Sequence, residues 1–420
     1  MSAAVVSRAQ AERAAEILRT THTIRERCGQ LLARARAGDS PWWSVNDDRI
    51  AQAAHAVSQS IRERYPKLHI PFHSRWRHFE AGGVDRRARL EQQLVGQDPT
   101  LRAKAMIDLT VVSVLLDAGA GAEWKYVEPA SGQTFSRSEG LGIASFHAFM
   151  GGLFSSDKER PLQADAVGLR AINTDHLASV LQVSHSNPMV GLEGRAVLLR
   201  RLGEAMAEQP EVFGEDGRPG GLFDMLVTPH GSQVPHTADI SAHDILSQLL
   251  MTLSAIWPSA NNIGGVALGD CWRHSAVRGE GASDGWVPFH KLSQWLTYSL
   301  LEPFAWAGVN VRGADALTGL PEYRNGGLLM DTEVLALEEP ANADTTWLPG
   351  DELIVEWRAL TVALLDEVAM HVRSELKMDE QHLPLARVLE GGTWAAGRAL
   401  SQRLRGGLPP LKVTSDGTVF

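Results

Sequence analysis

Two short stretches of the chain place ionisable groups among aromatic and apolar residues. Residues 288–296 read PFHKLSQWL, and residues 319–327 read GLPEYRNGG. A charged side chain is rarely buried without a partner, because the loss of its hydration is unfavourable. A lysine, a glutamate and an arginine in such surroundings therefore indicate a site for binding or catalysis.

Lys291 lies near the expected start of a helix, shortly after Pro288. A proline suits the first turn of a helix, where an ammonium group faces the positive end of the helix dipole. We therefore expect an anion beside Lys291, either Glu322 or a substrate phosphate. Gln294 and Trp295 follow at i+3 and i+4 and share its helix face. The alternative is a lysine whose stem lies along the helix end while its amine reaches solvent.

Glu322 lies in a glycine-flanked turn, directly after Pro321. A carboxylate on such a loop can approach a ligand closely. Arg324 could grip a phosphate or hold Glu322 in position, because a guanidinium makes bidentate contacts. The tripeptide of Glu322, Tyr323 and Arg324 would equally suit an ordinary surface turn.

Asp270 is a second candidate carboxylate, in the run GDCWRH at residues 269–274. It could serve as a second acid or accept a hydrogen bond from a substrate hydroxyl. A helix cap by Asp270, or an ion pair between Asp270 and Arg273, would explain the run nearly as well.

Two further segments could line a cleft or bind an anion. Residues 70–83 read IPFHSRWRHFEAGG, include Arg75, and are expected to form a loop with a short helix. Residues 390–398 read EGGTWAAGR, where two glycines precede a helix whose free N–H groups could hold an anion. A solvated loop and an ordinary helix start are the respective alternatives.

Metal and nucleotide motifs are weak or missing. The two cysteines, Cys28 and Cys271, lack CxxC spacing, so neither a disulfide framework nor a thiolate zinc site is indicated. Histidines 230, 236 and 243 lie near two aspartates, but without HExxH spacing we expect no metal. Phosphate loops of the GxxxxGK type and GxGxxG fingerprints are absent from the sequence.

The composition is that of a soluble globular protein. The 420 residues are 44% hydrophobic and 21% charged, with a formal net charge of -10. A nucleic-acid partner is disfavoured, because binding the phosphate backbone requires a basic surface. The chain shows neither a signal-peptide pattern nor a long apolar run, so we expect a cytoplasmic protein without a membrane partner.

Apolar residues at helical spacing dominate the chain. Helices are expected at about 8–37, 47–65, 101–116, 161–182, 193–208, 240–256, 289–304, 351–377 and 383–405. Small β-hairpins are expected at 124–135 and at 411–420, the latter around Asp416 and Gly417. The pattern predicts a mainly α fold, one compact domain over residues 1–420, with an N-terminal helical subdomain over residues 1–90.

Motifs along the whole chain resemble the uracil catabolism protein 4 family. They read, in order, HSRWRHFEAGG, DAGAGAEWKY, RSEGL, GDCWRH, PFHKLSQWLTYSLLEPF, GLPEYRNGG and EGGTWAAGR. The resemblance implies a pyrimidine-degradation route in which uracil becomes a nucleotide, its ring is opened and urea is released. Some members carry the label uracil phosphoribosyltransferase, but the acidic pair and Thr-Gly phosphate loop of that class are missing here.

A second similarity connects the two opening stretches. Queuosine-salvage nucleotide N-glycosidases, helical proteins related in shape to DNA glycosylases, have a Lys and a Gln where Lys291 and Gln294 stand. Their Asp-Tyr-Arg turn is similar to Glu322, Tyr323 and Arg324. Glu replaces Asp in this chain, which keeps the carboxylate chemistry but lengthens its reach. The Pro-Gln that follows in those proteins is also replaced here, by Asn-Gly.

The two resemblances together imply an N-glycosidase, a hydrolase of nucleotide metabolism. It would cleave the C1′–N bond of a ring-opened pyrimidine nucleotide, converting ribosyl-urea 5′-phosphate to urea and ribose 5-phosphate. Glu322, or in second place Asp270, would stabilise the oxocarbenium-like state, and Lys291 or His290 would help the leaving group depart.

The remaining roles concern substrate binding. The expected binding residues are Arg324, Arg273, Arg75, Gln294, Trp295, Trp272, His290 and Tyr323. We expect a small phosphorylated ribosyl substrate and no metal or organic cofactor, and a homodimer stays possible. The alternatives are a non-catalytic helical binding or scaffold protein of the same pathway and, ranked last, a uracil phosphoribosyltransferase.

Overall fold

A computed structural model describes residues 6–227, 238–257 and 261–414 of the chain. The fold is mainly α, as the sequence predicts, and its strands form only two-stranded sheets. The chain divides into two compact units, each assembled from discontinuous segments. Unit 1 takes in Met1–His73, Ser259–Gln294 and Gly313–Ser415, and unit 2 takes in Ser74–Pro258, Trp295–Arg312 and Asp416–Phe420.

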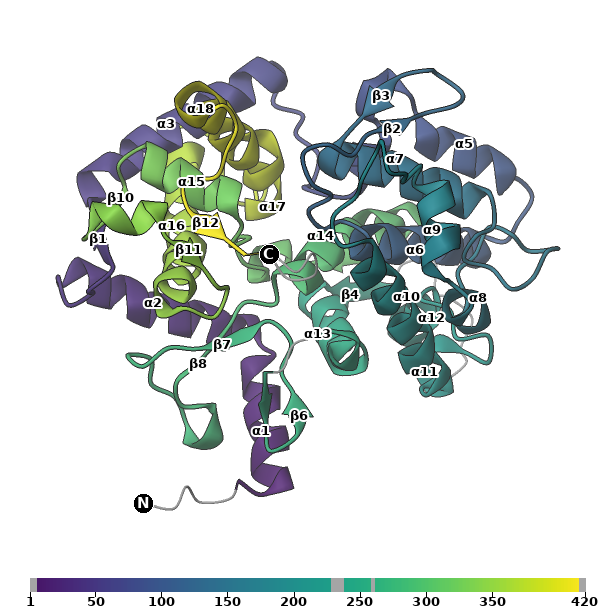
Figure 1. The fold of residues 1–420 in the computed structure, drawn as a ribbon, viewed down its shortest axis with the longest axis horizontal. Coiled ribbons are helices and arrows are strands. Elements are labelled where there is room, and N and C mark those ends of the chain that lie inside the picture. Colours follow the sequence, from purple (N-terminus) through teal and green to yellow (C-terminus); the bar gives the residue numbers. More distant parts are fainter. Residues whose placement is uncertain (1–5, 228–237, 258–260, 415–420) are drawn as a thin grey trace. The chain divides into compact units, whose positions relative to one another are not determined.

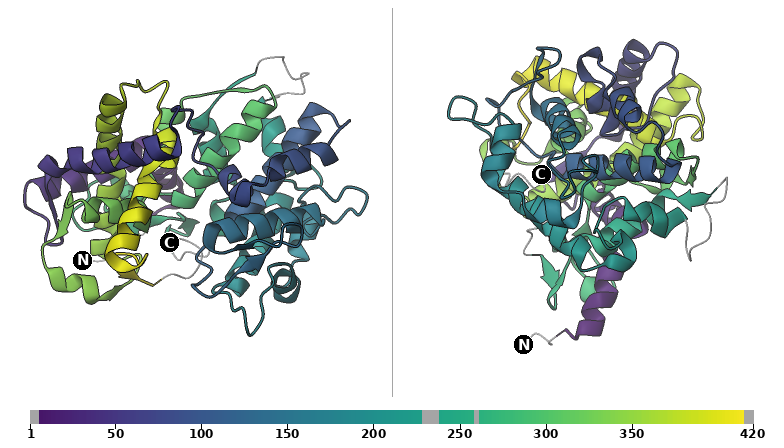
Figure 2. Two further views of the ribbon diagram at one scale, coloured as in Figure 1. Left: turned by 90° about the horizontal axis from the view of Figure 1, so that it is seen from above. Right: turned by 90° about the vertical axis from the view of Figure 1, so that its right-hand side faces the viewer.

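Unit 1 combines the N-terminal helices with helices from the C-terminal third. Its helices are α1 (Arg8–Leu18), α2 (Thr21–Arg36), α3 (Ile50–Arg64), α15 (Tyr323–Asp331), α16 (Glu352–Leu376), α17 (Leu385–Val388) and α18 (Trp394–Arg405). Its strand pairs are β1 (Trp43–Val45) with β10 (Leu335–Leu337), β5 (Asn262–Ile263) with β6 (Val266–Ala267), β7 (Cys271–Arg273) with β8 (Trp286–Pro288), and β11 (Thr346–Trp347) with β12 (Lys412–Val413). Figures 1 and 2 show the purple N-terminal helices beside the green and yellow C-terminal ones.

The long helix α16 forms the core of unit 1. It is apolar on most sides and packs against α2 and α3. Val355, Ala359 and Val362 of α16 join a fully buried cluster with Ile24 and Cys28 of α2. Because such a helix is covered by neighbours on several sides, its buried charged residues have to find partners inside the unit.

Unit 2 is built around the buried helix α6. Its helices are α4 (Trp76–Phe79), α5 (Arg86–Gln93), α6 (Pro99–Leu115), α7 (Arg137–Met150), α8 (Ala166–Arg170), α9 (Thr174–Val180), α10 (Leu192–Ala207), α11 (Pro210–Phe213), α12 (Gly221–Val227) and α13 (Ala242–Thr252). Its strands pair β2 (Tyr126–Val127) with β3 (Thr134–Phe135) and β4 (Asp239–Ser241) with β9 (Asn310–Arg312). Helix α14 (Lys291–Trp306) contributes its first residues to unit 1 and the rest to unit 2.

Some predicted elements differ from the structure or extend beyond it, and others are confirmed. The single helix expected at 8–37 is two helices, because Thr20 accepts the Thr23 N–H at 3.1 Å and starts α2 anew. The hairpin expected near Tyr126 is present as β2 and β3, with Tyr126 opposite Phe135. Lys412–Val413 pairs in parallel with Thr346–Trp347, and the rest of the hairpin expected at 411–420, including its turn at Asp416 and Gly417, lies outside the described residues.

The predicted domain boundaries are not decided by these units. Residues 1–73 of the expected N-terminal subdomain belong to unit 1, and residues 74–90 belong to unit 2. One domain over residues 1–420 and a separate subdomain over residues 1–90 therefore stay predictions.

Candidate active site

The two stretches singled out in the sequence meet inside unit 1. Gln294, in the first turn of α14, is fully buried and faces the segment before Glu322. Its Oε1 accepts the Thr318 N–H at 2.9 Å, and its Nε2 donates to the Thr318 hydroxyl. These two hydrogen bonds hold the start of α14 against the loop that leads into α15.

Glu322 is the N-cap of α15. Its Oε2 accepts the Arg324 N–H at 2.7 Å, and its Oε1 accepts the Asn325 N–H at 2.6 Å. Burial raises the pKa of Glu322, and the two N–H groups together with the positive charge of Lys291 offset that effect only in part. The result is a desolvated carboxylate at the positive end of a helix, with a lysine close enough to act on it.

Asp270 has a different environment. Arg358 of α16 makes two parallel hydrogen bonds to it, Nη1 to Oδ1 and Nη2 to Oδ2, each at 2.8 Å. Trp272 Nε1 donates to Oδ1 at 2.7 Å, and the Lys291 N–H donates to Oδ2 at 3.0 Å. Burial alone would raise the pKa of Asp270, but the charge and hydrogen bonds of Arg358 outweigh it and hold that pKa well below its usual value.

Lys291 interacts with both carboxylates. Its backbone N–H is bound to Asp270, and its positive charge acts on Glu322. The positive charge of Lys291 thus acts on Glu322, one of the two anions expected beside it, and a substrate phosphate at this place stays a prediction. The side chain of Lys291 is only partly exposed, which strengthens its electrostatic effect relative to an ammonium in open water.

Arg358 is a charged residue of the site that the sequence analysis did not single out. Its guanidinium is 1% exposed, lies 4.1 Å from the ring centroid of Phe289, and has Nε 3.4 Å from the Pro321 carbonyl oxygen. The available signal was a charged residue in a largely apolar run, residues 353–362, which reads LIVEWRALTV and also holds Glu356. Its partner could not be deduced from that signal, because Asp270 lies far away in sequence.

The guanidinium of Arg324 is directed towards α18. It donates to the Ser401 hydroxyl and, at 3.2 Å, to the Gly407 carbonyl, and it lies 4.7 Å from the ring centroid of Tyr323. Arg324 is buried, whereas Tyr323 is partly exposed. These contacts explain Arg324 as part of the packing between α15 and α18, and its role at a phosphate stays a prediction.

Arg273 and His290 also have partners within unit 1. Arg273 is exposed on β7, donates to the Asp284 carbonyl at 2.7 Å and covers the Trp286 ring at 4.3 Å. The ion pair considered between Asp270 and Arg273 is replaced by the pair with Arg358. His290 is buried with its Nε2 2.9 Å from the Leu18 carbonyl oxygen, and burial lowers its pKa. The role of His290 as a proton donor to the leaving group stays a prediction.

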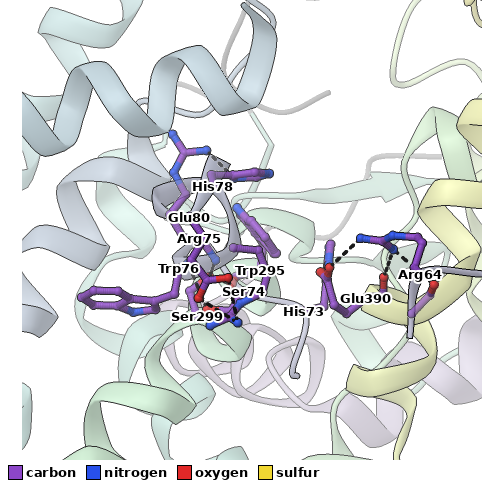
Figure 3. Close-up of polar contacts among 12 residues, drawn as sticks. Arg64, His73, Ser74, Arg75, Trp76, His78, Glu80, Trp295, Ser299 and Glu390 are labelled. Carbon is purple, nitrogen blue, oxygen red and sulfur yellow. Dashed lines mark hydrogen bonds and ion pairs between the residues drawn. The ribbon is translucent and has the colours of Figure 1, made fainter. Parts of the chain in front are cut away.

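Arg75 and Trp295 belong to unit 2. Arg75 is fully buried, with Nη1 2.9 Å from Asp117 Oδ2 and Nε donating to the Ser113 hydroxyl at 2.7 Å. Figure 3 shows Arg75 together with His78, whose ring lies 6.0 Å from that of Trp295. Contacts inside unit 2 thus account for both side chains, and their roles in binding a substrate stay predictions.

Residues 390–398 form a different structure from the expected helix start. Leu389–Thr393 is a π-helical turn that runs directly into α18, so its N–H groups lie inside a continuous helical segment. Glu390 accepts from Arg64 at 3.1 Å and Tyr65 at 3.2 Å, and it lies 3.0 Å from His73 Nδ1 (Figure 3). Where the sequence suggested an anion site, the Glu390 carboxylate thus lies with cationic and hydroxyl partners from the protein itself.

Other chemistries find little support in the described residues. Residues 281–285 read GASDG, the spacing of a serine nucleophile elbow, but Ser283 is buried in a 3₁₀ turn and donates to the Glu280 carbonyl at 2.8 Å. Across residues 6–227, 238–257 and 261–414, no three metal-ligating side chains gather in one place. Histidines 230 and 236 lie outside those ranges. None of the helices described is both long and apolar enough to cross a bilayer.

The fold and these contacts define a mainly α protein with a carboxylate and a lysine brought together at two helix starts. Residues 17–420 match a family described as "Protein of unknown function (DUF1688)". Protein urg3 of Schizosaccharomyces pombe is 38% identical over 405 residues, covering 94% of this chain and 96% of its own. Uracil catabolism protein 4 of Lachancea kluyveri is 38% identical over 378 residues, covering 84% of this chain and 85% of its own. The chain belongs to this family, the uracil catabolism protein 4 family.

Proposed function

We propose that the protein acts in uracil catabolism as an N-glycosidase that cleaves ribosyl-urea 5′-phosphate, or a related ring-opened pyrimidine nucleotide. The pathway is proposed from the name of the Lachancea kluyveri relative. The reaction is proposed from one observation, the half-buried Glu322 carboxylate at the N-cap of α15, on which the charge of Lys291 acts. A carboxylate and an ammonium are the two groups that this bond cleavage needs.

The carboxylate acts on the sugar. When the C1′–N bond lengthens, positive charge develops on the ribose ring, and a carboxylate beneath C1′ stabilises it. Glu322 suits this role because a desolvated carboxylate interacts more strongly with a developing charge than a hydrated one. Its raised pKa also suits a base that takes a proton from the attacking water.

The lysine acts on the leaving group. The electron pair of the broken C1′–N bond goes to the urea nitrogen, which takes a proton from the Lys291 ammonium. Water forms the new bond to C1′ and gives its proton to Glu322. Transfer of that proton from Glu322 to Lys291 restores both groups, so the step needs neither a metal nor an organic cofactor.

Asp270 and Gln294 hold the helix starts that carry these two groups. Asp270 already accepts four hydrogen bonds, and Gln294 is engaged with Thr318. Among the three arginines proposed for the 5′-phosphate, Arg273 is the exposed one and is retained as the first candidate. The mainly α fold gives no support to a phosphoribosyltransferase, whose fold alternates strands and helices.

The experiment supplies ribosyl-urea 5′-phosphate to the purified chain and measures released urea and ribose 5-phosphate. Wild type should form both in equal amounts, and Glu322→Gln should lose about 100-fold or more of the rate while staying folded. Asp85→Asn is the matched control, because Asp85 is also a helix N-cap and accepts the Ala88 N–H at 2.9 Å. It should keep the wild-type rate.

Two results would overturn the proposal. Failure of wild type to turn over any ring-opened or intact uridine nucleotide would exclude the glycosidase. Binding of the nucleotide without turnover would favour the alternative of a binding protein in the same pathway.

A further inference from the structure

We propose that Arg358 is the positioning residue of this site. It fixes where Lys291 and Glu322 lie relative to each other. The inference rests on the proposed function. It concerns a residue in the middle of the long helix α16, which is buried and separated from both stretches in the sequence. Arg358 acts through other residues and needs no contact with the substrate.

The start of α14 depends on Asp270. The residues just before Lys291 are Val287, Pro288, Phe289 and His290, and none of these is a usual capping residue. Asp270, the residue just before β7, supplies the missing hydrogen-bond acceptors. Its carbonyl oxygen accepts the Phe289 N–H at 2.9 Å and the His290 N–H at 3.3 Å, and its Oδ2 accepts the Lys291 N–H at 3.0 Å. The position of Lys291 therefore depends on the position of Asp270.

Arg358 fixes Asp270 and reaches the second helix start as well. Its two Nη atoms hold both oxygens of Asp270, and its Nε lies 3.4 Å from the carbonyl oxygen of Pro321, which directly precedes Glu322. A guanidinium presents its donors in a fixed plane, so one rigid group touches both helix starts. A lysine in its place would keep the charge but could not maintain these three directions at once.

Helix α16 also packs against the turn that carries Glu322. Trp357 packs against Gly326 of α15, where an added Cβ would lie 2.7 Å from the indole ring. Leu365 packs against Gly319, where an added Cβ would lie 2.8 Å from its side chain. Because α16 is in close contact with both ends of the Glu322 turn, loosening Arg358 should shift the carboxylate relative to the lysine more than it disturbs the fold.

Displacement of Lys291 should change the pKa of Glu322 in a definite direction. The charges that act on Glu322 are those of Lys291 and Arg324, and both lower its pKa. The neighbouring helices add Arg358, which is paired with Asp270, and Arg405 of α18, which is paired with Asp331. If Lys291 moves away, the pKa of Glu322 rises further, and the acidic limb of the kcat profile moves to higher pH.

The test compares Arg358→Lys with Arg86→Lys. Arg86 makes the same kind of buried bidentate pair in unit 2, to Glu128 at 2.8 and 2.7 Å, with both side chains fully buried. Arg358→Lys should lower kcat about 10- to 100-fold, leave KM within about twofold and raise the acidic limb. Arg86→Lys should lower thermal stability but keep the wild-type kcat and pH profile.

A double variant tests whether Arg358 acts through Asp270. Arg358→Lys combined with Asp270→Asn should lose no more kcat than the more severe single variant, because the two residues act as one unit. Fully additive losses, or a wild-type kcat and pH profile for Arg358→Lys, would overturn the positioning role while leaving the glycosidase intact.

Hydrogen exchange gives a readout that does not depend on turnover. Peptides covering residues 288–294 and 320–328 contain the N–H groups bound to Asp270 and Glu322. Arg358→Lys should speed exchange in these two peptides selectively, and Arg86→Lys should not. This pattern without urea release in wild type would support the positioning role and refute the proposed function. Unchanged exchange at both peptides would refute the positioning role.

Discussion

Two carboxylates of unit 1 lie at helix starts and interact with Lys291. Their surroundings nevertheless shift their pKa values in opposite directions. Asp270 accepts four hydrogen bonds, two of them from Arg358, and its pKa is lowered. Glu322 accepts two backbone N–H groups, and burial raises its pKa. A carboxylate saturated with donors is an anchor, whereas one with fewer partners and a desolvated charge can interact with a substrate.

The difference lies mainly in the partner that each carboxylate faces. Arg358 meets Asp270 with two parallel donors at 2.8 Å, the geometry that stabilises an ionised carboxylate most effectively. Lys291 offers Glu322 a single charge on a flexible stem, so the compensation for burial is incomplete. Opposed pKa shifts in two neighbouring acids are a common way for a site to separate structural from chemical roles.

Removal of the Glu322 side chain should have the largest effect. Glu322→Ala should lower urea release about 1,000-fold, because both the stabilising charge and the base are lost. Added formate should restore part of the rate by occupying the space of the carboxylate. The rates with and without formate give the measurement, and a rate within tenfold of wild type (about 1.4 kcal/mol) would transfer the catalytic role elsewhere.

Asp270→Asn should lower stability strongly and lower the rate less than the loss of Glu322 does. It leaves Arg358 buried without its counter-charge, and the free energy of unfolding should fall by about 3 kcal/mol. Guanidinium unfolding followed by tryptophan fluorescence measures the loss. An unfolding curve like that of wild type, combined with abolished turnover, would reverse the roles assigned to the two carboxylates.

Lys291→Met should have a smaller effect on the rate, about 100-fold. The proton donor is lost, and the pKa of Glu322 rises because the positive charge that lowers it is gone. The acidic limb of the pH–rate profile should therefore move to higher pH. A profile that keeps its limb would show that Lys291 and Glu322 are not coupled.

The pH dependence of stability should differ in sign between the two carboxylates, with the smallest energies of this series. The pKa of Asp270 is lowered in the folded state, so its contribution is present above the ordinary aspartate pKa and lost as pH falls towards the folded value. The pKa of Glu322 is raised, so its contribution is present at low pH and lost as pH rises through the folded value.

Unfolding of the two amide variants between about pH 3 and about pH 7 measures these signs. The stability deficit of Asp270→Asn should grow as pH rises from the acid end. The deficit of Glu322→Gln should shrink over the same range. Parallel curves for the two variants would mean that their environments are alike.

The sequence was informative where a pattern is local. Helical spacing predicted the mainly α fold, and the two clusters of strand-forming residues around Ser131 and Gly132 predicted the β2–β3 hairpin. The expectation of an anion beside Lys291 followed from the helix dipole alone. The break between α1 and α2 was missed because Thr20 can serve as a cap or as a helical residue, and the surrounding tertiary structure decides between them.

The partners of buried charges could not be predicted in the same way. Asp270 and Arg358 lie far apart in sequence, and a guanidinium in the buried part of a helix does not reveal which carboxylate it contacts. The same holds for Arg324, whose partners Ser401 and Gly407 come from the end of the chain. Such contacts depend on how helices pack, which a single sequence does not encode in any local pattern.

The central claim is that Glu322 performs the chemistry and Asp270 holds the site together. The most direct test is a single-turnover measurement of C1′–N bond cleavage in ribosyl-urea 5′-phosphate by wild type, Glu322→Gln and Asp270→Asn, each corrected for its folded fraction. The account predicts that Glu322→Gln is slower than Asp270→Asn by about tenfold or more. Equal rates for the two variants, or a slower Asp270→Asn, would contradict it.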